Sequence, residues 1–134
     1  MIKETLSFDD VLLVPGYSDI ESRSQVDIGN NLDDNIRLSL PVISSPMDTV
    51  TEDHMSDAMV QAGGMGIIHR YNTIEEQAGI AKRVFIYNPG ATVGAAIGMT
   101  GDYMERAQAL CDAGVGVLCI DVAHGHHSMM KKCL

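Results

Sequence analysis

GMGIIH, residues 64–69, is a short apolar run in which polar and apolar residues do not alternate. A continuous run of this length is typical of a parallel strand that is covered on both faces, whereas a strand with one wet face alternates. Three similar runs flank it in the sequence: PVISS at 41–45, ATVGAAI at 91–97 and VGVLCID at 115–121. The four runs therefore predict four buried parallel strands.

Helix-like segments lie between these runs. Thr49-Val50-Thr51-Glu52 predicts a threonine N-cap just before Glu52, and Gly63 ends that segment. Thr73 and Glu76 have the spacing of a capping box and open a helix expected over 73–83. A third helix is expected over 100–113 with Gly114 as its stop, and a fourth from about residue 126. The apolar residues at helical spacing, which we expect to face the core, are Met55, Ala58, Met59, Ala62, Met104, Ala107, Leu110 and Cys111.

The predicted strands begin about 23 to 27 residues apart, and each interval holds one strand, one helix and two short loops. Such a βα repeat forms either an open doubly wound sheet or a closed eight-stranded barrel. Periodicity alone favours an open, flavodoxin-like α/β domain, because that fold closes with this many residues. A (β/α)8 barrel needs about 250 residues, so four βα units would form only its N-terminal half.

Composition excludes several classes of protein. The 134 residues are 46% hydrophobic, and their formal net charge of −9 repels polyanions, which argues against nucleic-acid binding. Every apolar run is far shorter than the roughly 20 residues that cross a bilayer. The N-terminus lacks the pattern of a secretory signal, so a cytoplasmic location is expected. The three cysteines, Cys111, Cys119 and Cys133, form no C-x-x-C pair and are expected to be reduced thiols, with Cys119 in the core.

Polar residues follow each predicted strand. Ligands of α/β proteins bind at the carboxyl ends of the strands, so these residues define one expected binding face. Neither G-x-G-x-x-G nor G-x-x-x-x-G-K-[ST] occurs, which leaves a Rossmann site and a P-loop unsupported. Some alternatives stay open: Asp48 and Thr49 could cap a helix or contact a ligand, and Asp121 could be a structural acid. His124, His126 and His127 favour a solvated loop over a metal site.

Five stretches carry a resemblance to a known family. They are LSFDDVLLVP (6–15), LPVISSPMDTVTE (40–52), GGMGIIHR (63–70), VGAAIG (93–98) and IDVAHGH (120–126). In this order, and over nearly the whole chain, they resemble the IMP dehydrogenase and GMP reductase family. The resemblance implies that residues 1–134 are a partial barrel domain, the N-terminal half of a (β/α)8 TIM barrel.

The resemblance also implies an oxidoreductase of purine biosynthesis, in which NAD-dependent oxidation converts IMP to XMP on the route to GMP. Ser45 and Met47 match residues that bind the purine nucleotide, the hydroxyl as an anchor and the thioether against the base. Asp121 matches the aspartate that holds the nicotinamide riboside of NAD, and Val122 and Ala123 line the same edge. A homo-oligomer, a tetramer in the family, is implied as well.

The chain departs from the family pattern in important ways. The family's nucleophilic cysteine follows the sixth strand, beyond Leu134, so no catalytic residue is expected in this chain and the chain alone is expected to be inactive. The family's monovalent-cation site and its flap with an arginine base are likewise expected to be absent. Only about seven residues, 84–90, stand where many dehydrogenases insert CBS motifs. Two alternatives therefore remain: an NADPH-dependent GMP reductase, which converts GMP to IMP, and a non-catalytic half-barrel that binds nucleotides or serves assembly. The Asp-Val-Ala-His-Gly sequence at 121–125 favours the dehydrogenase over the reductase.

Overall fold

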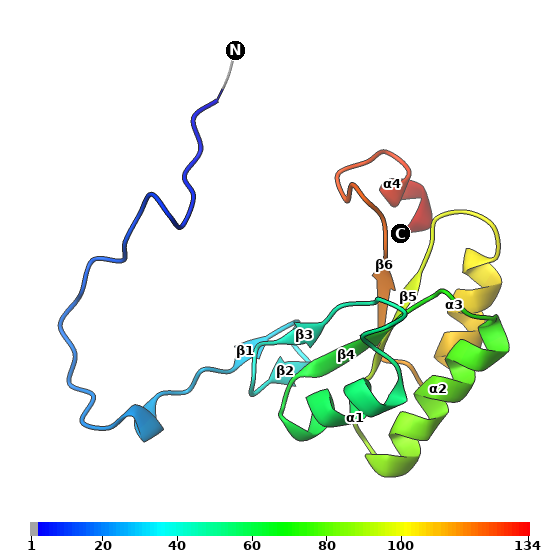
Figure 1. The fold of residues 1–134 in the computed structure, drawn as a ribbon, viewed down its shortest axis with the longest axis horizontal. Helices are drawn as coiled ribbons and strands as arrows, with labels where there is room; N and C mark the ends of the chain where they lie inside the picture. Colours follow the sequence, from blue (N-terminus) through cyan, green and yellow to red (C-terminus); the bar gives the residue numbers. More distant parts are fainter. Residues whose placement is uncertain (1–2) are drawn as a thin grey trace.

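A computed structural model describes residues 3–134 and shows an α/β protein with a parallel sheet. The sheet and its helices form one body, from which the N-terminal segment extends (Figure 1). In chain order the elements are the 3-10 helix η1 (Arg23–Gln25), β1 (Asn30–Asn31), β2 (Arg37–Leu38), β3 (Ile43–Ser44), α1 (Asp53–Gln61), β4 (Met65–Ile68), α2 (Ile74–Tyr87), β5 (Gly94–Ile97), α3 (Tyr103–Asp112), β6 (Val117–Ile120) and α4 (Met130–Cys133).

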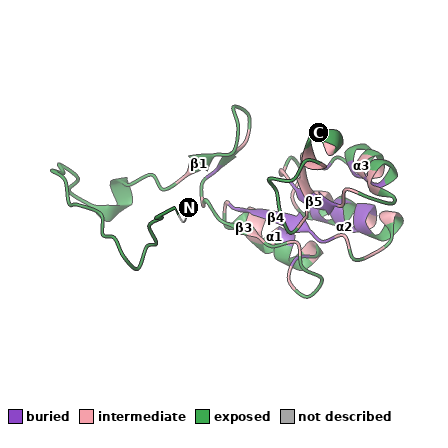
Figure 2. Cartoon of the chain, turned by 90° about the horizontal axis from the view of Figure 1, so that it is seen from above, coloured by how far each residue is buried: buried purple, intermediate pink, exposed green. Residues whose placement is uncertain are grey.

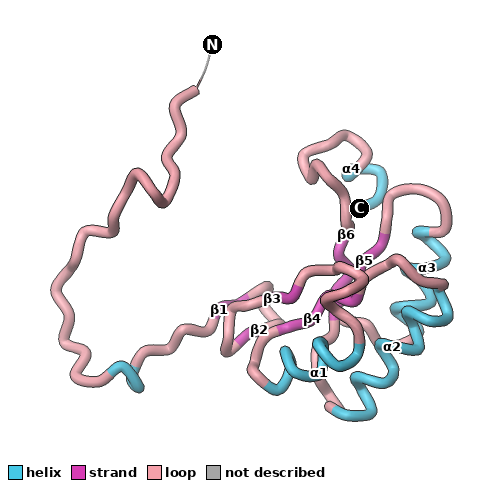
Figure 3. Tube along the Cα trace, in the orientation of Figure 1, coloured by secondary structure: helices cyan, strands magenta, loops and turns pink. Residues whose placement is uncertain are grey.

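The four predicted strands form one parallel sheet in the order β3-β4-β5-β6, which is also their order in the chain. The connecting helices α1, α2 and α3 pack against one another in sequence along the sheet (Figure 3). β1 and β2 form a separate antiparallel hairpin that the sequence did not predict. The open flavodoxin-like order expected from periodicity alone is not observed, because each strand pairs with the strand that precedes it in the chain.

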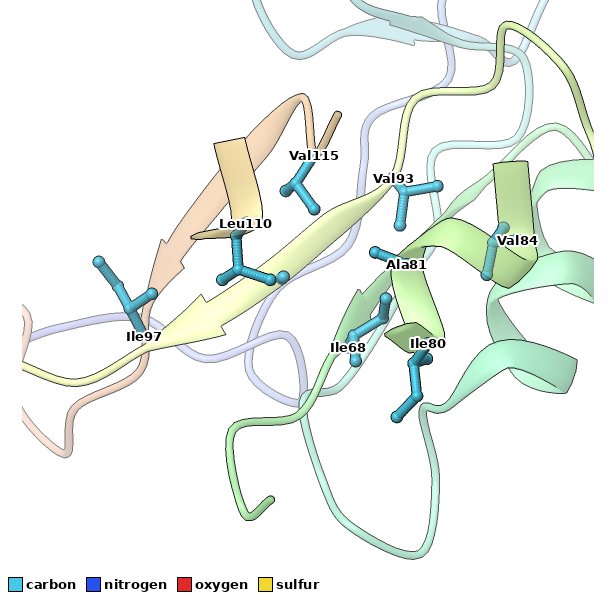
Figure 4. Close-up of a cluster of buried hydrophobic side chains, with 9 residues drawn as sticks. Ile68, Ile80, Ala81, Val84, Val93, Ile97, Leu110 and Val115 are labelled. Atoms are coloured by element: carbon cyan, nitrogen blue, oxygen red, sulfur yellow. The ribbon is translucent and has the colours of Figure 1, made fainter. Parts of the chain in front are cut away.

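The sheet carries a hydrophobic layer on each face. The layer beneath the helices brings together Ile68, Ala95 and Ile97 from the strands and Leu110 from α3, with further side chains from α2 (Figure 4). On the other face, Met65 of β4 and Leu38 of the hairpin belong to a second hydrophobic cluster. Coverage on both faces explains why the central strands read as continuous apolar runs.

The two outer strands are less buried than their sequences predicted. Ile43 of β3 is 42% exposed, and β3 spans only two residues. All four residues of β6 are half-buried, whereas those of β4 and β5 are buried (Figure 2). Cys119 is accordingly half-buried at the margin of the second cluster. The reason is position: β3 and β6 each have a neighbouring strand on one side only.

The predicted helix starts are confirmed where the signal is local. The Thr73 hydroxyl accepts a hydrogen bond from the Glu76 backbone N–H, and the Glu76 carboxylate accepts one from the Thr73 backbone N–H, so the capping box forms. The helix then continues to Tyr87, beyond the predicted end, and leaves residues 88–93 as the connection to β5. Gly63 and Gly114 end their helices with φ of 86° and 93°, values that favour glycine.

The prediction of a threonine cap on the first helix is wrong. Glu52 occupies the N-cap position of α1 without a side-chain cap, and the Thr51 hydroxyl is used elsewhere. Asp48 and Thr49 lie in the preceding turn, and within residues 3–134 neither side chain caps α1. The fourth helix begins at Met130, later than predicted, because residues 125–129 form turns and a bend.

The predicted apolar faces of α1 and α3 are also largely wrong. Met55, Ala58, Ala62, Met104 and Cys111 are exposed. The buried residues of these helices are Ser56 on α1 and Arg106 with Leu110 on α3. Ser56 is buried because α1 approaches β4 so closely that a Cβ on Gly66 would lie 2.7 Å from the Ser56 Cα atom. Only a small residue fits this contact, so apolar spacing could not identify it.

The N-terminal segment, residues 3–29, extends away from the sheet (Figures 1 and 2). Its large apolar side chains are exposed, including Phe8 at 94% and Leu13 at 96%. None of the helices within residues 3–134 has both the length and the apolar character needed to cross a membrane.

Candidate functional site

The carboxyl ends of the parallel strands meet at one edge of the sheet, and two neighbouring pockets lie there. The first pocket, of about 490 Å³, is lined by Ser45, Pro46, Met47, Asp48, Tyr71 and Asp121. The second pocket, of about 460 Å³, is lined by Arg70, Tyr71, Gly98, Met99, Thr100, Asp121, Val122, Ala123 and Met129. Tyr71 and Asp121 line both, so they form the boundary between the two pockets.

The loop after β3 places Ser45 and Met47 at the first pocket, and one buried hydroxyl holds that loop. The Thr51 side chain is fully buried and donates a hydrogen bond to the Ser45 carbonyl oxygen, at 2.6 Å. It also lies 2.9 Å from the Ser44 hydroxyl. Met47 is 52% exposed at the pocket wall. The loop therefore turns back on itself and presents the Ser45 and Met47 side chains to the pocket.

A buried histidine joins this loop to the end of β4. His69 is 3% exposed, and its Nδ1 accepts a hydrogen bond from the Tyr71 backbone N–H. Because Nδ1 is an acceptor, the proton is on Nε2, which donates to Glu52 Oε1 at 3.1 Å. The His69 backbone N–H also donates to the Thr51 carbonyl oxygen, at 3.3 Å. These bonds fix the start of α1 against β4 beside the first pocket.

Asp121 follows β6 and is anchored from two directions. Its backbone N–H donates to the Ile97 carbonyl oxygen at 2.9 Å, which continues the β5–β6 pairing past the end of the strand. Its carboxylate Oδ2 accepts a hydrogen bond from Arg70 Nε at 3.2 Å. The Asp121 side chain is 29% exposed, so the carboxylate is accessible from the pockets.

Beneath these loops lies a buried polar network. Gln77 of α2 is fully buried and donates through its side-chain amide to the carbonyl oxygens of Ile68 and Ala96, the first of them the last residue of β4. Arg106 of α3 is 6% exposed and donates to the Gln77 side-chain oxygen and to the Asn72 carbonyl oxygen. The network therefore links α2 and α3 to the strand ends that precede the site.

The cysteines lie outside both pockets. Burial raises the pKa of the Cys119 thiol, and the nearby Asp121 carboxylate raises it further, so the thiol is protonated at neutral pH. All three cysteines are free, as predicted. Within residues 3–134, no group of three or more histidine, cysteine or acidic side chains could hold a metal ion. His124, His126 and His127 are exposed.

The structure places every predicted site residue at these pockets. Ser45 and Met47 line the first pocket together with Asp121, while Val122 and Ala123 line the second with the same aspartate. Sequence reasoning missed Tyr71, which borders both pockets, and the pairing of Arg70 with Asp121. The only sequence signal for Arg70 and Tyr71 was their position directly after the second predicted strand. Arg70 and Asp121 are 51 residues apart, so local sequence pattern could not show that they pair.

Comparison with known proteins agrees with the sequence motifs. Residues 5–134 match the family model of the IMP dehydrogenase / GMP reductase domain. The inosine-5'-monophosphate dehydrogenase of Nitrosopumilus maritimus (strain SCM1) is 62% identical over 76 residues, which cover 57% of this chain and 16% of that protein. The enzyme of the same name from Staphylococcus epidermidis (strain RP62A) is 43% identical over 112 residues, which cover 75% of this chain and 23% of that protein. The corresponding Staphylococcus aureus (strain COL) enzyme is 42% identical over the same length.

The matched segments span only 16% to 23% of the length of these curated relatives. The family match nevertheless covers nearly all of the chain, including every strand of the parallel sheet and both pockets. The chain therefore belongs to the IMP dehydrogenase / GMP reductase family.

Proposed function

We propose that residues 41–134 form the first four βα units of a (β/α)8 barrel. Consecutive strands are neighbours throughout the sheet, and consecutive helices α1, α2 and α3 are neighbours too. This sequential order belongs to a barrel, whereas doubly wound sheets reverse direction at a switch point. The polar loops lie at the carboxyl ends of the strands, where barrel enzymes bind their substrates.

We infer that this strand-end site serves the NAD-dependent oxidation of IMP to XMP. The observation that carries the proposal is the shared boundary of the two pockets. Ser45 and Met47 share the first pocket with Asp121, and Asp121 shares the second pocket with Val122 and Ala123. Two adjoining pockets suit a reaction in which a purine nucleotide must lie beside a dinucleotide.

The residues of the first pocket suit a nucleotide. The Ser45 hydroxyl can donate to or accept from a polar group of IMP, and the Met47 thioether can pack against the flat purine ring. Both side chains come from one loop, which Thr51 holds in place. Their role is to bind and orient the substrate rather than to react with it.

The residues of the second pocket suit the nicotinamide riboside. Within residues 3–134, the Asp121 Oδ1 atom has no hydrogen-bond donor, so it is free to accept from ribose hydroxyl groups. Val122 and Ala123 add apolar wall, and the volume of about 460 Å³ falls in the usual range for small-molecule pockets. When bound, NAD supplies the hydride acceptor, and the nucleophile comes from a segment outside this chain.

A GMP reductase, with NADP in place of NAD, is the second candidate. The observation that favours it is the short connection between α2 and β5, residues 88–93, which contains no regulatory domain. Dehydrogenases without CBS motifs share this feature. A non-catalytic half-barrel that binds nucleotides would use the same pockets, and turnover distinguishes it from both enzymes.

Binding to single-residue variants tests the site. Asp121→Ala should weaken NAD binding tenfold or more, since hydrogen bonds to a charged acceptor contribute about 1.5–3 kcal/mol and about 1.4 kcal/mol is tenfold. Ser45→Ala should weaken IMP binding by less, because a neutral hydroxyl contributes about 0.5–1.5 kcal/mol. Isothermal titration of each variant with each ligand measures both dissociation constants. Asp34→Ala and Ser128→Ala, which change exposed residues outside the pockets, are the matched controls.

The ligand preference of each variant decides the assignment. Asp121→Ala should affect NAD more than IMP, and Ser45→Ala should do the reverse. Equal effects of Asp121→Ala on both ligands would leave Asp121 as a structural acid at the end of β6.

We also expect the 134-residue chain to produce no NADH from IMP and NAD. Neither pocket contains a cysteine, and the Cys119 thiol is protonated, so covalent attack on the purine lacks its nucleophile. Absorbance at the NADH band measures the reaction. Turnover that disappears on replacing Cys111, Cys119 or Cys133 by serine would contradict this expectation.

A further inference from the structure

Arg70 connects two loops whose strands are not neighbours. It follows β4, and its partner Asp121 follows β6, with β5 between them. The guanidinium makes two contacts to the same residue: Nε donates to the Oδ2 atom at 3.2 Å, and the Nη2 group donates to the backbone carbonyl oxygen at 3.4 Å. Both the side chain and the backbone of Asp121 are therefore held by one arginine.

Gly98 lies beside the Arg70 side chain where that side chain passes the end of β5. A Cβ atom at this position would lie 3.5 Å from Arg70 Nη1 and 3.9 Å from its Cζ atom. These are van der Waals distances, so the Arg70 guanidinium packs against Gly98 at the end of β5. The arginine after β4 therefore passes a glycine after β5 and reaches the aspartate after β6.

Tyr71 holds the guanidinium from another direction. The Arg70 Cζ atom lies 5.3 Å from the centre of the Tyr71 ring, within the range of a cation–π contact. The Tyr71 backbone is fixed in turn by its hydrogen bond to His69. The Arg70 guanidinium therefore contacts both the Tyr71 ring and the Asp121 carboxylate.

This geometry determines which oxygen of Asp121 remains available. Oδ2 is engaged by Arg70, while Oδ1 has no donor among residues 3–134. An aspartate side chain that is already held in one rotamer loses less conformational freedom when a ligand binds. An arginine fork can hold both the carboxylate and the backbone, whereas a single point charge cannot.

We propose that Arg70 is a positioning residue of the second pocket, which holds Asp121 so that its Oδ1 atom faces a dinucleotide. This proposal rests on the proposed function, because it takes Asp121 as the group that binds NAD. Two of the three guanidinium nitrogens, Nε and Nη2, are already engaged by Asp121, so in this proposal Arg70 acts through the aspartate.

A double-mutant cycle tests the proposal with NAD as the probe. Arg70→Met removes the fork and keeps an unbranched apolar side chain against Tyr71. In the wild-type background it should weaken NAD binding by about three- to tenfold. In the Asp121→Ala background the same change should have almost no effect, because the residue through which Arg70 acts is gone. Titration calorimetry on the four proteins gives the coupling, and circular dichroism verifies that each is folded.

Arg83→Met is the matched control. Arg83 also pairs through Nε with an aspartate Oδ2, in this case Asp53, but it lines neither pocket. Its replacement should leave the NAD dissociation constant unchanged in both backgrounds.

A ligand-free measurement separates the two proposals. The Arg70 Nε–H proton should exchange slowly with solvent in ¹H–¹⁵N spectra of the wild-type chain and quickly in Asp121→Ala. If the wild-type chain binds no NAD while this proton stays protected, the proposed function fails and takes the positioning role with it. If NAD binds but Arg70→Met binds it equally well, the positioning role alone is overturned. Additive effects of the two changes would show direct contact of Arg70 with the ligand and would also overturn it.

Discussion

Replacement of Arg106 by alanine is expected to lower the free energy of unfolding by about 2–6 kcal/mol, because two oxygen atoms that accept hydrogen bonds from its guanidinium lose their donor. Arg106 is 6% exposed and donates to Gln77, Asn72 and Asp102. Without the guanidinium, the Gln77 side-chain oxygen and the Asn72 carbonyl oxygen lose their donor in a buried region. Each such group left without a partner costs about 1–3 kcal/mol.

Urea unfolding followed by circular dichroism at one protein concentration measures this effect. Arg37→Ala is the control, because Arg37 pairs with Asp27 where both side chains are exposed and should cost at most about 1 kcal/mol. A loss for Arg106→Ala no larger than for Arg37→Ala would mean that the network does not stabilise the fold.

Acid should weaken part of this network. The hydrogen bond from Arg106 lowers the pKa of Asp102 below its ordinary value of 3.8. A carboxyl whose pKa is lower in the folded chain stabilises the fold above its unfolded-state pKa, and that contribution is lost as the pH falls through the folded-state pKa. The difference in stability between the wild type and Arg106→Ala should therefore shrink below pH 3.8.

Replacement of Leu110 by alanine is expected to cost about 2–5 kcal/mol, because it leaves a cavity in a packed core. The Leu110 side chain is fully buried between α3 and the sheet, where it packs with Ile68, Ile97 and Val115 (Figure 4). Urea unfolding again gives the loss of stability.

Met104→Ala is the matched control on the same helix. Met104 is 64% exposed, so its replacement should change the stability by no more than about 0.5 kcal/mol. The sequence pattern had placed Met104 and Leu110 on one buried face, and equal losses for the two variants would restore that interpretation.

The sequence by itself determined those features that depend on near neighbours or on repeated pattern. The capping box of Thr73 and Glu76 closes within four residues, so its geometry follows from the local sequence. Four evenly spaced apolar runs determined the number of strands in the main sheet and their parallel arrangement, but not the β1–β2 hairpin. The positions of Ser45, Met47 and Asp121 directly after their strands predicted that these side chains would meet at one edge of the sheet, where both pockets lie.

Only the tertiary structure decided the features that join distant parts of the chain. Thr51 resembles a helix cap in sequence but donates to the Ser45 carbonyl instead, because the loop after β3 folds back over it. Ser56 and Arg106 interrupt the apolar pattern of their helices and are buried nonetheless. Ser56 packs against Gly66 of β4, and Arg106 donates to the Gln77 side chain of α2. In neither case does the partner lie on the same helix.

The boundary between the two pockets likewise has one part that the sequence predicted and one that only the tertiary structure decided. The sequence placed Arg70, Gly98 and Asp121 after three different strands, but it could not show that the arginine crosses the glycine to reach the aspartate. That contact spans 51 residues and exists only because parallel strands bring their carboxyl ends to one edge of a sheet. Short-range pattern determines the strands and helices, while side-chain partners across the sheet are decided by how those elements pack.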